Sequence, residues 1–117
     1  MYNFEKPKAW QEAMKLAKIS YVLSQKLPKE EKFALIDQLK RAVTSVSLNI
    51  TEGSGAGSSK IFVSFLEISI RSLYETIAIF KLIENLFNIN CKEELLQCDL
   101  VNKILHGLLK SIKSNNQ

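Results

Sequence analysis

Four polar residues have the types needed for acid–base chemistry. Asn49 and Glu52 lie close to the apolar stripe of one helical pattern, and Ser72 and Glu75 lie close to that of the next. A connecting loop would bring the two patterns together, and paired carboxylates serve in acid–base catalysis or metal binding in helix bundles. The alternative is that Glu52 and Glu75 are cap and hydrogen-bond partners that fix the register of two helices. We favour this structural role.

Few other residues are candidates for catalysis or metal binding. A di-iron bundle needs Glu-x-x-His motifs, and His106 is the single histidine. Cys91 and Cys98 would share a helix face about 10 Å apart, too far for a disulfide. One histidine and two cysteines are not a usual zinc set. We therefore expect free thiols that are buried or half-buried, an ordinary helix histidine, no metal or other cofactor, and no enzymatic activity.

A glycine-rich segment, Gly-Ser-Gly-Ala-Gly-Ser-Ser-Lys at 53–60, is the candidate for phosphate binding. It precedes a helix N-terminus, which attracts anions. It also follows a helix rather than a strand, and it lacks the Gly-Lys-Ser/Thr order of a P-loop. The segment therefore favours an inter-helix link, with Gly53 as the left-handed residue that ends one helix and Ser58 or Ser59 capping the next.

Basic side chains are the candidates for a nucleic-acid interface. The chain has 16 Lys and Arg against 12 Asp and Glu, a net charge of +4. That charge permits nucleic-acid binding without requiring it. No recognition motif and no interleaved aromatic platform accompanies the candidates, and scattered lysines usually form a solvated face. The candidates are Lys15, Lys18, Lys40, Arg41, Lys60 and Arg71.

Four amphipathic patterns would position these residues. Apolar residues recur at helical spacing in each pattern, and no segment has the period of a strand. The second pattern opens with Glu30 and Glu31, acidic residues that suit a first turn, and residues 114–117 are expected to fray. The predicted helices are 8–26, 29–52, 59–87 and 92–113. The sequence predicts one all-α domain over residues 1–117, folded as an antiparallel up-down-up-down four-helix bundle.

The third predicted helix is apolar on two sides. One stripe is Phe62, Phe65, Ser69, Ser72, Thr76, Phe80, Ile83 and Phe87, and the second is Ile61, Ile68, Ile79, Leu82 and Leu86. A surface helix needs one apolar face, and large exposed apolar patches are rare on monomers. We therefore expect this helix to be central or to meet another subunit, and we expect a homo-oligomer.

The sequence predicts neither export nor a membrane segment. Residues 1–6 have no apolar core of a signal peptide, and no run approaches the roughly 18 apolar residues of a membrane span. We expect a cytoplasmic protein without a membrane partner.

Several segments together resemble the four-helix-bundle family encoded in the intervening sequences of 23S rRNA. They are Gln38–Ala42, Ser45–Gly53, Phe62–Ser69 and Ser72–Glu75, with Leu27–Glu31 resembling the family's first inter-helix turn and Phe4 with Trp10 resembling its N-terminal end. The Asn-Ile-x-Glu-Gly core at 49–53, with Ser72 and Glu75 downstream, is the most specific part.

This resemblance implies a bundle that assembles as a ring, typically a pentamer. A related branch, the accessory variability proteins of diversity-generating retroelements, works with a reverse transcriptase and binds nucleic acid. The implied partner here is rRNA or another nucleic acid. The alternative is a protein-interaction scaffold or accessory subunit, for example of a reverse transcriptase, without direct nucleic-acid contact. Two departures bear on this: Ala56 stands where many members have Arg, and Arg71 where many have Gly.

Overall fold

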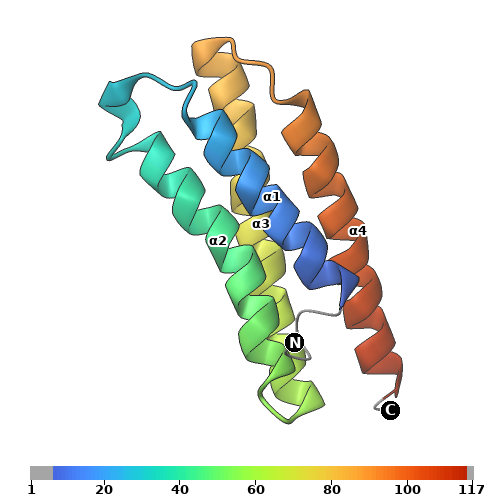
Figure 1. Ribbon diagram of the computed structural model, residues 1–117. Coiled ribbons are helices and arrows are strands. Elements are labelled where there is room, and N and C mark those ends of the chain that lie inside the picture. The colour runs from blue at the N-terminus through green and yellow to red at the C-terminus, as the bar shows by residue number, and fades with distance from the viewer. Residues whose placement is uncertain (1–6, 116–117) are drawn as a thin grey trace.

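The computed structural model describes residues 7–115 and contains four long helices. They are α1 (Lys8–Ser24), α2 (Leu35–Ser54), α3 (Ser59–Phe87) and α4 (Lys92–Asn115), with a short 3-10 turn, η2 (Lys29–Glu31), before α2. No strand occurs within residues 7–115. The prediction of an all-α protein with four helices is confirmed. Figure 1 shows the chain turning back at each connection, which is compatible with the predicted up-down order.

Each helix packs against two neighbours. α1 contacts α2 and α4, α3 contacts the same two helices, and the α2–α3 pairing is the most extensive. All four helices contribute completely buried side chains to one core, for example Leu16 of α1, Val43 of α2, Phe80 of α3 and Leu105 of α4. The long axis of the molecule, 48 Å, is about the length of α3, since 29 residues of helix span roughly 43 Å. The bundle is therefore one helix long, and every helix lies at the surface.

The end of α2 differs from the prediction. Gly53 was expected to end the helix in a left-handed conformation, but α2 continues through it to Ser54. The C-cap residue Gly55 has a φ of −90°, and the left-handed glycine is Gly57, with a φ of +74°. The turn into α3 therefore needs a glycine at position 57 and not at position 53.

Close packing between α2 and α3 explains the glycine at position 53. Gly53 is buried, and a Cβ atom built on it would lie 2.8 Å from Cδ1 of Phe62 and 2.8 Å from Cβ of Phe65. Real Cβ atoms do not approach other heavy atoms so closely. Gly53 therefore lets the backbone of α2 lie directly against the first turns of α3.

The start of the second helix also differs, because α2 begins at Leu35 rather than at position 29. Ile36 and Leu39 begin the inward-facing stripe of α2, and continuing its spacing backwards reaches Lys32 and Lys29. Packing of an apolar face provides most of the stability of a helix in a protein. These lysines offer no apolar side chain to the core, so the α-helix does not extend over them.

Residues 29–34 form a link instead. The Glu31 amide donates to the Pro28 carbonyl oxygen (3.0 Å), and the Ala34 amide donates to the Glu31 carbonyl oxygen (3.0 Å). Glu30 and Glu31 therefore lie in η2 rather than in the first turn of α2. Phe33 extends from this link with 88% of its surface exposed, more than any other large hydrophobic residue within residues 7–115.

Polar side chains set the remaining helix ends. The Ser58 hydroxyl accepts from the Ile61 amide (3.4 Å), so Ser58 rather than Ser59 caps α3. Asn90 Oδ1 accepts from the Lys92 amide (2.8 Å) at the start of α4. α4 continues to Asn115, across part of the tail that was expected to fray. Positions 116 and 117, and Phe4 at the other end, lie outside the described residues.

None of the helices within residues 7–115 has the length and apolar character needed to cross a membrane.

Candidate functional site

The predicted polar cluster is present at the α2–α3 contact, but only its uncharged members are connected. Asn49 Nδ2 donates to the Ser45 carbonyl oxygen (2.8 Å) and to the Ser45 hydroxyl (2.9 Å). That hydroxyl lies 2.8 Å from the hydroxyl of Ser72 on α3. Deeper in the bundle, the Ser69 hydroxyl donates to the Val46 carbonyl oxygen (2.7 Å). These bonds, made without a carboxylate, fix the register of α3 against α2.

The two carboxylates do not have the role expected for them. Glu52 and Glu75 are both exposed, and neither has a hydrogen-bond or ion-pair partner among the described residues. Hydrogen bonds made by Ser45 and Ser69 fix the register of α3 against α2 instead. The sequence signal for Ser69, which the prediction missed, is a hydroxyl within an apolar stripe, since buried polar groups are hydrogen-bonded. Among residues 7–115, no three His, Cys, Asp or Glu side chains gather as metal ligands would.

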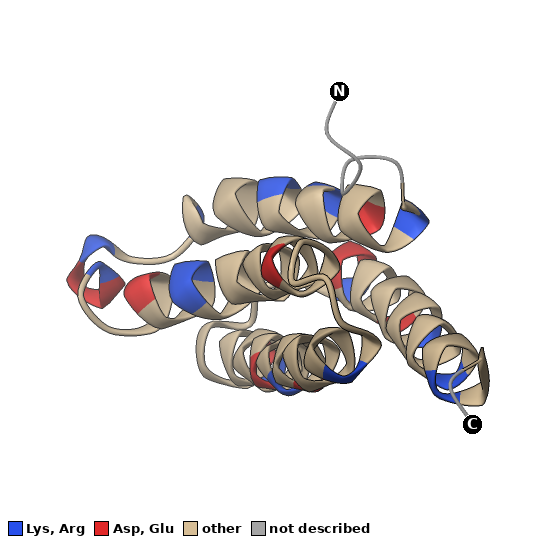
Figure 2. Ribbon diagram, turned by 90° about the horizontal axis from the view of Figure 1, so that it is seen from below, with Lys and Arg blue, Asp and Glu red and all other residues tan. Residues whose placement is uncertain are grey.

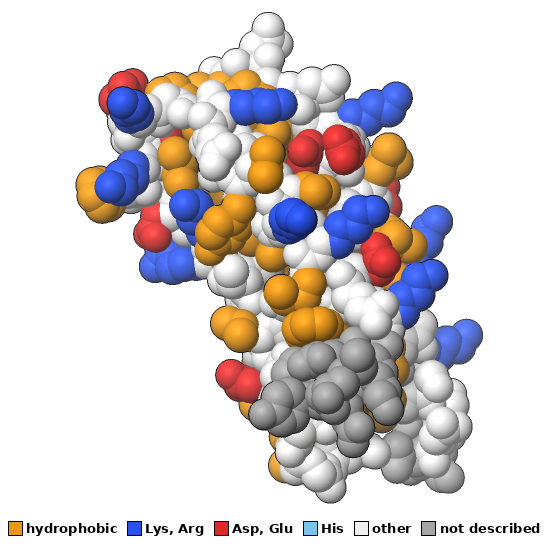
Figure 3. All heavy atoms as spheres, in the orientation of Figure 1, with side chains coloured by type: hydrophobic (Ala, Val, Ile, Leu, Met, Phe, Trp, Pro, Cys, Tyr) orange, Lys and Arg blue, Asp and Glu red, His pale blue; other side chains and the backbone are white. Residues whose placement is uncertain are grey.

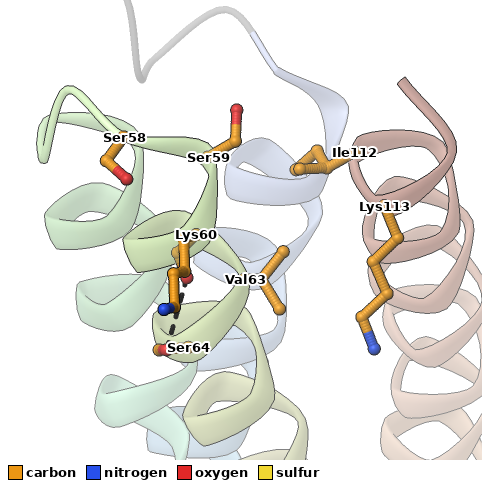
Figure 4. Close-up of a pocket in the computed structure, with 7 residues that line it drawn as sticks. All are labelled: Ser58, Ser59, Lys60, Val63, Ser64, Ile112 and Lys113. Carbon is orange, nitrogen blue, oxygen red and sulfur yellow. Dashed lines mark hydrogen bonds between the residues drawn. The ribbon is translucent and has the colours of Figure 1, made fainter. Parts of the chain in front are cut away.

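The glycine-rich segment borders a hollow of about 660 Å³ between the start of α3 and the end of α4. Figure 4 shows the hydroxyls of Ser58 and Ser59 near its rim. The ammonium groups of Lys60 and Lys113 extend away from that rim, along separate helices (Figure 4). The groups that would bind a phosphate therefore do not converge, and the segment serves as a link and a cap.

Both thiols are free and completely buried. Burial, with the nearby carboxylates of Glu94 and Glu84, raises the pKa of Cys91 from 9.0 to about 11. Burial, with the carboxylates of Asp99 and Glu94, raises the pKa of Cys98 to about 12. The thiolate is the nucleophile in cysteine chemistry, so neither side chain is prepared for it in the folded protein.

We expect both cysteines of the native protein to resist a disulfide reagent such as DTNB at pH 8 and to react rapidly in denaturant. The unfolded thiols ionise near pH 9, below the raised pKa values of the folded state. Their contribution to stability is therefore complete below pH 9 and is lost as the pH rises through about 11 for Cys91 and about 12 for Cys98. Rapid reaction of either thiol in the native state would contradict the burial described here. A Cys91→Ser variant assigns the reacting residue.

His106 lies on the α3–α4 surface. Its Nε2 is 3.1 Å from the hydroxyl of Tyr74, and both residues are exposed. The same surface has a groove of about 500 Å³ that Arg71 and Glu67 line. Ser64 and His106 line this groove too, and the side-chain partner of the histidine is the Tyr74 hydroxyl rather than that serine.

The structure does not bring the six predicted basic residues to one site. Lys60 lies at the start of α3, and Arg71 lies in the groove between α3 and α4. Arg41 lies on α2 and forms an ion pair with Asp37 (3.2 Å). Arg41 directly follows Lys40 on α2, whereas Lys60 and Arg71 lie on α3.

Lys15 and Lys18 lie on α1, and Lys40 lies on the neighbouring helix α2. Lys15 and Lys18 are exposed on α1, and Lys40 Nζ lies 4.8 Å from the centre of the Tyr21 ring, three residues beyond Lys18. Tyr21 is 42% exposed, so an aromatic ring does accompany these lysines, contrary to the sequence-based expectation.

Lys8 extends this group along α1, seven residues before Lys15 and therefore on the same side of the helix. The one acidic residue of α1, Glu12, faces α4, where its Oε1 accepts from Gln97 Nε2 (2.9 Å). Figure 2 shows basic segments along α1, and Figure 3 shows lysines among hydrophobic patches on the face that α1 crosses. We call Lys8, Lys15, Lys18 and Lys40 the α1 lysine face.

A second exposed surface is apolar. Ile61, Ile68 and Leu82 lie on α3 at multiples of seven residues and are 44%, 37% and 47% exposed. Glu75 occupies the missing position of this series and lines a groove with Arg41 of α2. Leu48, seven residues beyond Arg41, and Leu86 extend the surface and are 58% and 62% exposed. We call Leu48, Ile61, Ile68, Leu82 and Leu86 the α2/α3 stripe. Ile79 belongs to the second apolar stripe predicted for this helix, but its side chain is buried, so it is not part of the exposed surface.

Comparison with known proteins gives a family and a fold. Residues 5–107 match the family model described as 23S rRNA-intervening sequence protein. A solved structure of a protein with unknown function from the S23 ribosomal protein family, from Bacteroides thetaiotaomicron, is similar with a TM-score of 0.78 and 24% identity. The match covers 87% of this chain and 95% of that one, and at this identity it shows the fold alone. Comparison with curated proteins gave no match.

Proposed function

The chain belongs to the family of 23S rRNA-intervening sequence proteins, and from this we propose that it is a non-catalytic, oligomeric four-helix bundle that binds RNA or another nucleic acid. In this proposal the helices run antiparallel in up-down-up-down order, and the protein contacts phosphates rather than performing a reaction. The α1 lysine face is the observation that carries the proposal.

The α1 lysine face suits a phosphate backbone. Lys8 and Lys18 are ten positions apart on α1, a distance of about 15 Å along the helix. Phosphates of one strand follow each other about every 3.4 Å along a duplex, so the face lies alongside roughly four of them. Glu12 lies one helical turn from both Lys8 and Lys15 and lowers the positive charge there, while its carboxylate accepts a hydrogen bond from Gln97 Nε2 of α4.

Self-association would strengthen such binding. A single chain has a net charge of +4, but a ring would present the α1 lysine face repeatedly to one nucleic acid. The α2/α3 stripe supports association of identical chains, because it exposes four large apolar side chains on α3 and a fifth, Leu48, on the neighbouring α2. It lies on α2 and α3, whereas the lysine face is mainly on α1, so both surfaces can be used at once.

A salt-titrated binding assay with an rRNA helix tests the proposal. The triple variant Lys15→Gln, Lys18→Gln, Lys40→Gln is expected to bind at least about tenfold more weakly and to reduce the slope of log affinity against log salt by about 3, one per lysine. The matched control replaces three other exposed lysines, Lys81, Lys103 and Lys110, with Gln. Absence of binding by the native protein even at low salt would contradict the proposal, and an equal loss in the control would remove the α1 lysine face from it.

The second candidate function is a protein-interaction scaffold or an accessory subunit, for example of a polymerase. The α2/α3 stripe favours it, because the same apolar surface fits a protein partner. Affinity capture from the source organism with nuclease treatment separates the two candidates. A protein partner stays bound after the nucleic acid is digested, whereas proteins held only through RNA are released.

A further inference from the structure

The link between α1 and α2 carries an exposed aromatic ring beside lysines. The Phe33 side chain is 88% exposed, and Lys32 Nζ lies 5.4 Å from the centre of its ring. A groove of about 480 Å³ opens at the same link, and Lys29, Lys32 and Lys40 line it together with the apolar side chains of Leu27 and Ile36. An aromatic ring, an apolar groove and three ammonium groups therefore occur together.

The backbone fixes the position of the link. The Lys32 amide donates to the Lys29 carbonyl oxygen (3.1 Å), and the Ala34 amide donates to the Glu31 carbonyl oxygen (3.0 Å), so the segment that carries Phe33 is hydrogen-bonded on both sides. Phe33 is thus presented to solvent by an ordered turn.

The charges favour an anionic ligand. The lysines are the only charged side chains among the residues that line the groove. The nearest acidic residues along the chain are Glu30 and Glu31 in η2, and Asp37, which is bound to Arg41 (3.2 Å). A protein partner would have to remove water from several ammonium groups to reach Phe33, and lysine is depleted at the centres of protein interfaces for that reason. A nucleic acid supplies a phosphate for the lysines and a base for the ring.

We propose that Phe33, Lys29, Lys32 and Lys40, here called the link cluster, bind one unpaired nucleotide of an RNA whose neighbouring phosphates lie on the α1 lysine face. The base stacks on Phe33 beside Lys32, which also lines the groove, and the lysines bind its flanking phosphates. Stacking on an exposed aromatic ring is how proteins recognise unpaired bases, and the groove volume suits one nucleotide. The inference rests on the proposed function, because Lys40 belongs to both surfaces.

The test compares an RNA duplex with the same duplex carrying one unpaired adenosine, by fluorescence anisotropy at one salt concentration. We expect the native protein to prefer the bulged RNA. Phe33→Leu, which keeps an apolar side chain but removes the ring, should weaken binding to the bulged RNA by roughly tenfold and leave duplex binding unchanged. Phe33→Trp should retain the preference, with quenching of the new indole fluorescence on binding. Leu96→Ala, which shortens a similarly exposed side chain on α4 (60% exposed), should behave as the native protein does.

Each failure has a separate signature. If the native protein binds neither RNA at low salt, the proposed function fails and the link cluster fails with it. If both RNAs bind with the expected dependence on Lys15 and Lys18 while Phe33→Leu has no effect, or if the native protein shows no preference, the link cluster is overturned and the proposed function stands. If Phe33→Leu changes the mass measured by light scattering without RNA, Phe33 contacts a second copy and the inference is wrong. Unchanged circular dichroism shows that each variant is folded.

Discussion

Replacing Gly53 with alanine is expected to lower the free energy of unfolding by about 1–3 kcal/mol, the usual cost of an overpacked contact. Alanine is the better helix former by about 0.5–1 kcal/mol, so the backbone preference alone predicts the opposite sign. The packing effect dominates because the new methyl group would lie 2.8 Å from Cβ of Phe65, which cannot move without its backbone. α2 and α3 must therefore separate, and the most extensive helix pairing of the bundle is weakened.

Gly107 gives the matched control. It lies inside α4, and a Cβ atom there would meet no heavy atom within 4 Å. Gly107→Ala is therefore expected to stabilise the protein by about 0.5–1 kcal/mol. Urea unfolding followed by circular dichroism, at one protein concentration for all variants, measures both effects. Equal stabilisation by the two substitutions would show that α2 and α3 do not approach as closely at Gly53 as described.

If the chains assemble as proposed, introducing charge into the α2/α3 stripe is expected to reduce the assembly to a monomer of 13.3 kDa. The proposed variant is Ile68→Glu with Leu82→Glu. Both positions are partly exposed in the single chain, so the carboxylates remain solvated in the monomer and folding is preserved. In an assembled interface the two carboxylates would lose their hydration without gaining an ion-pair partner, which costs several kcal/mol for each ion. Light scattering measures the mass of the native protein and of the variant.

The control for this experiment is Leu96→Glu, the same kind of change at an exposed position of α4 outside the stripe. It should leave the mass of the assembly unchanged. A native protein that is monomeric at every concentration, or a double variant with the native mass, would overturn the proposed oligomer interface. Circular dichroism of the double variant distinguishes dissociation from loss of structure.

Where the sequence predicted the fold correctly, the prediction rested on local periodicity. The 3, 4, 3, 4 spacing of the apolar residues predicts the inward side of α2; Ile36 is half-buried there, and the others are buried: Leu39, Val43, Val46 and Ile50. The short polar link before α3 required a cap, and Ser58 provides it. Helix faces and helix caps depend on residues a few positions apart in the chain, so they can be predicted from the local sequence.

The features that the sequence did not predict depend on distant residues. A glycine near the end of a helical pattern usually ends the helix, and only the positions of Phe62 and Phe65 reveal that Gly53 is a point of close contact. The helix predicted from position 29 includes Phe33, so the sequence pattern does not reveal the exposure of its side chain. Glu52 and Glu75 were assigned partners because they flank apolar stripes, but the serines between α2 and α3 make those bonds.

The hydrogen bonds from Gln97 Nε2 to the carbonyl oxygen and carboxylate of Glu12 join positions 85 residues apart, at the contact between α1 and α4. The α2–α3 hairpin needs no such distant partner, since its contacts join neighbouring parts of the chain. During synthesis on the ribosome, the hairpin can therefore pair while α4 is still within the exit tunnel. The inner side of α1, including Ala13 and Leu16, must wait for α4 before it is fully covered. The bundle thus closes only after its last helix has emerged.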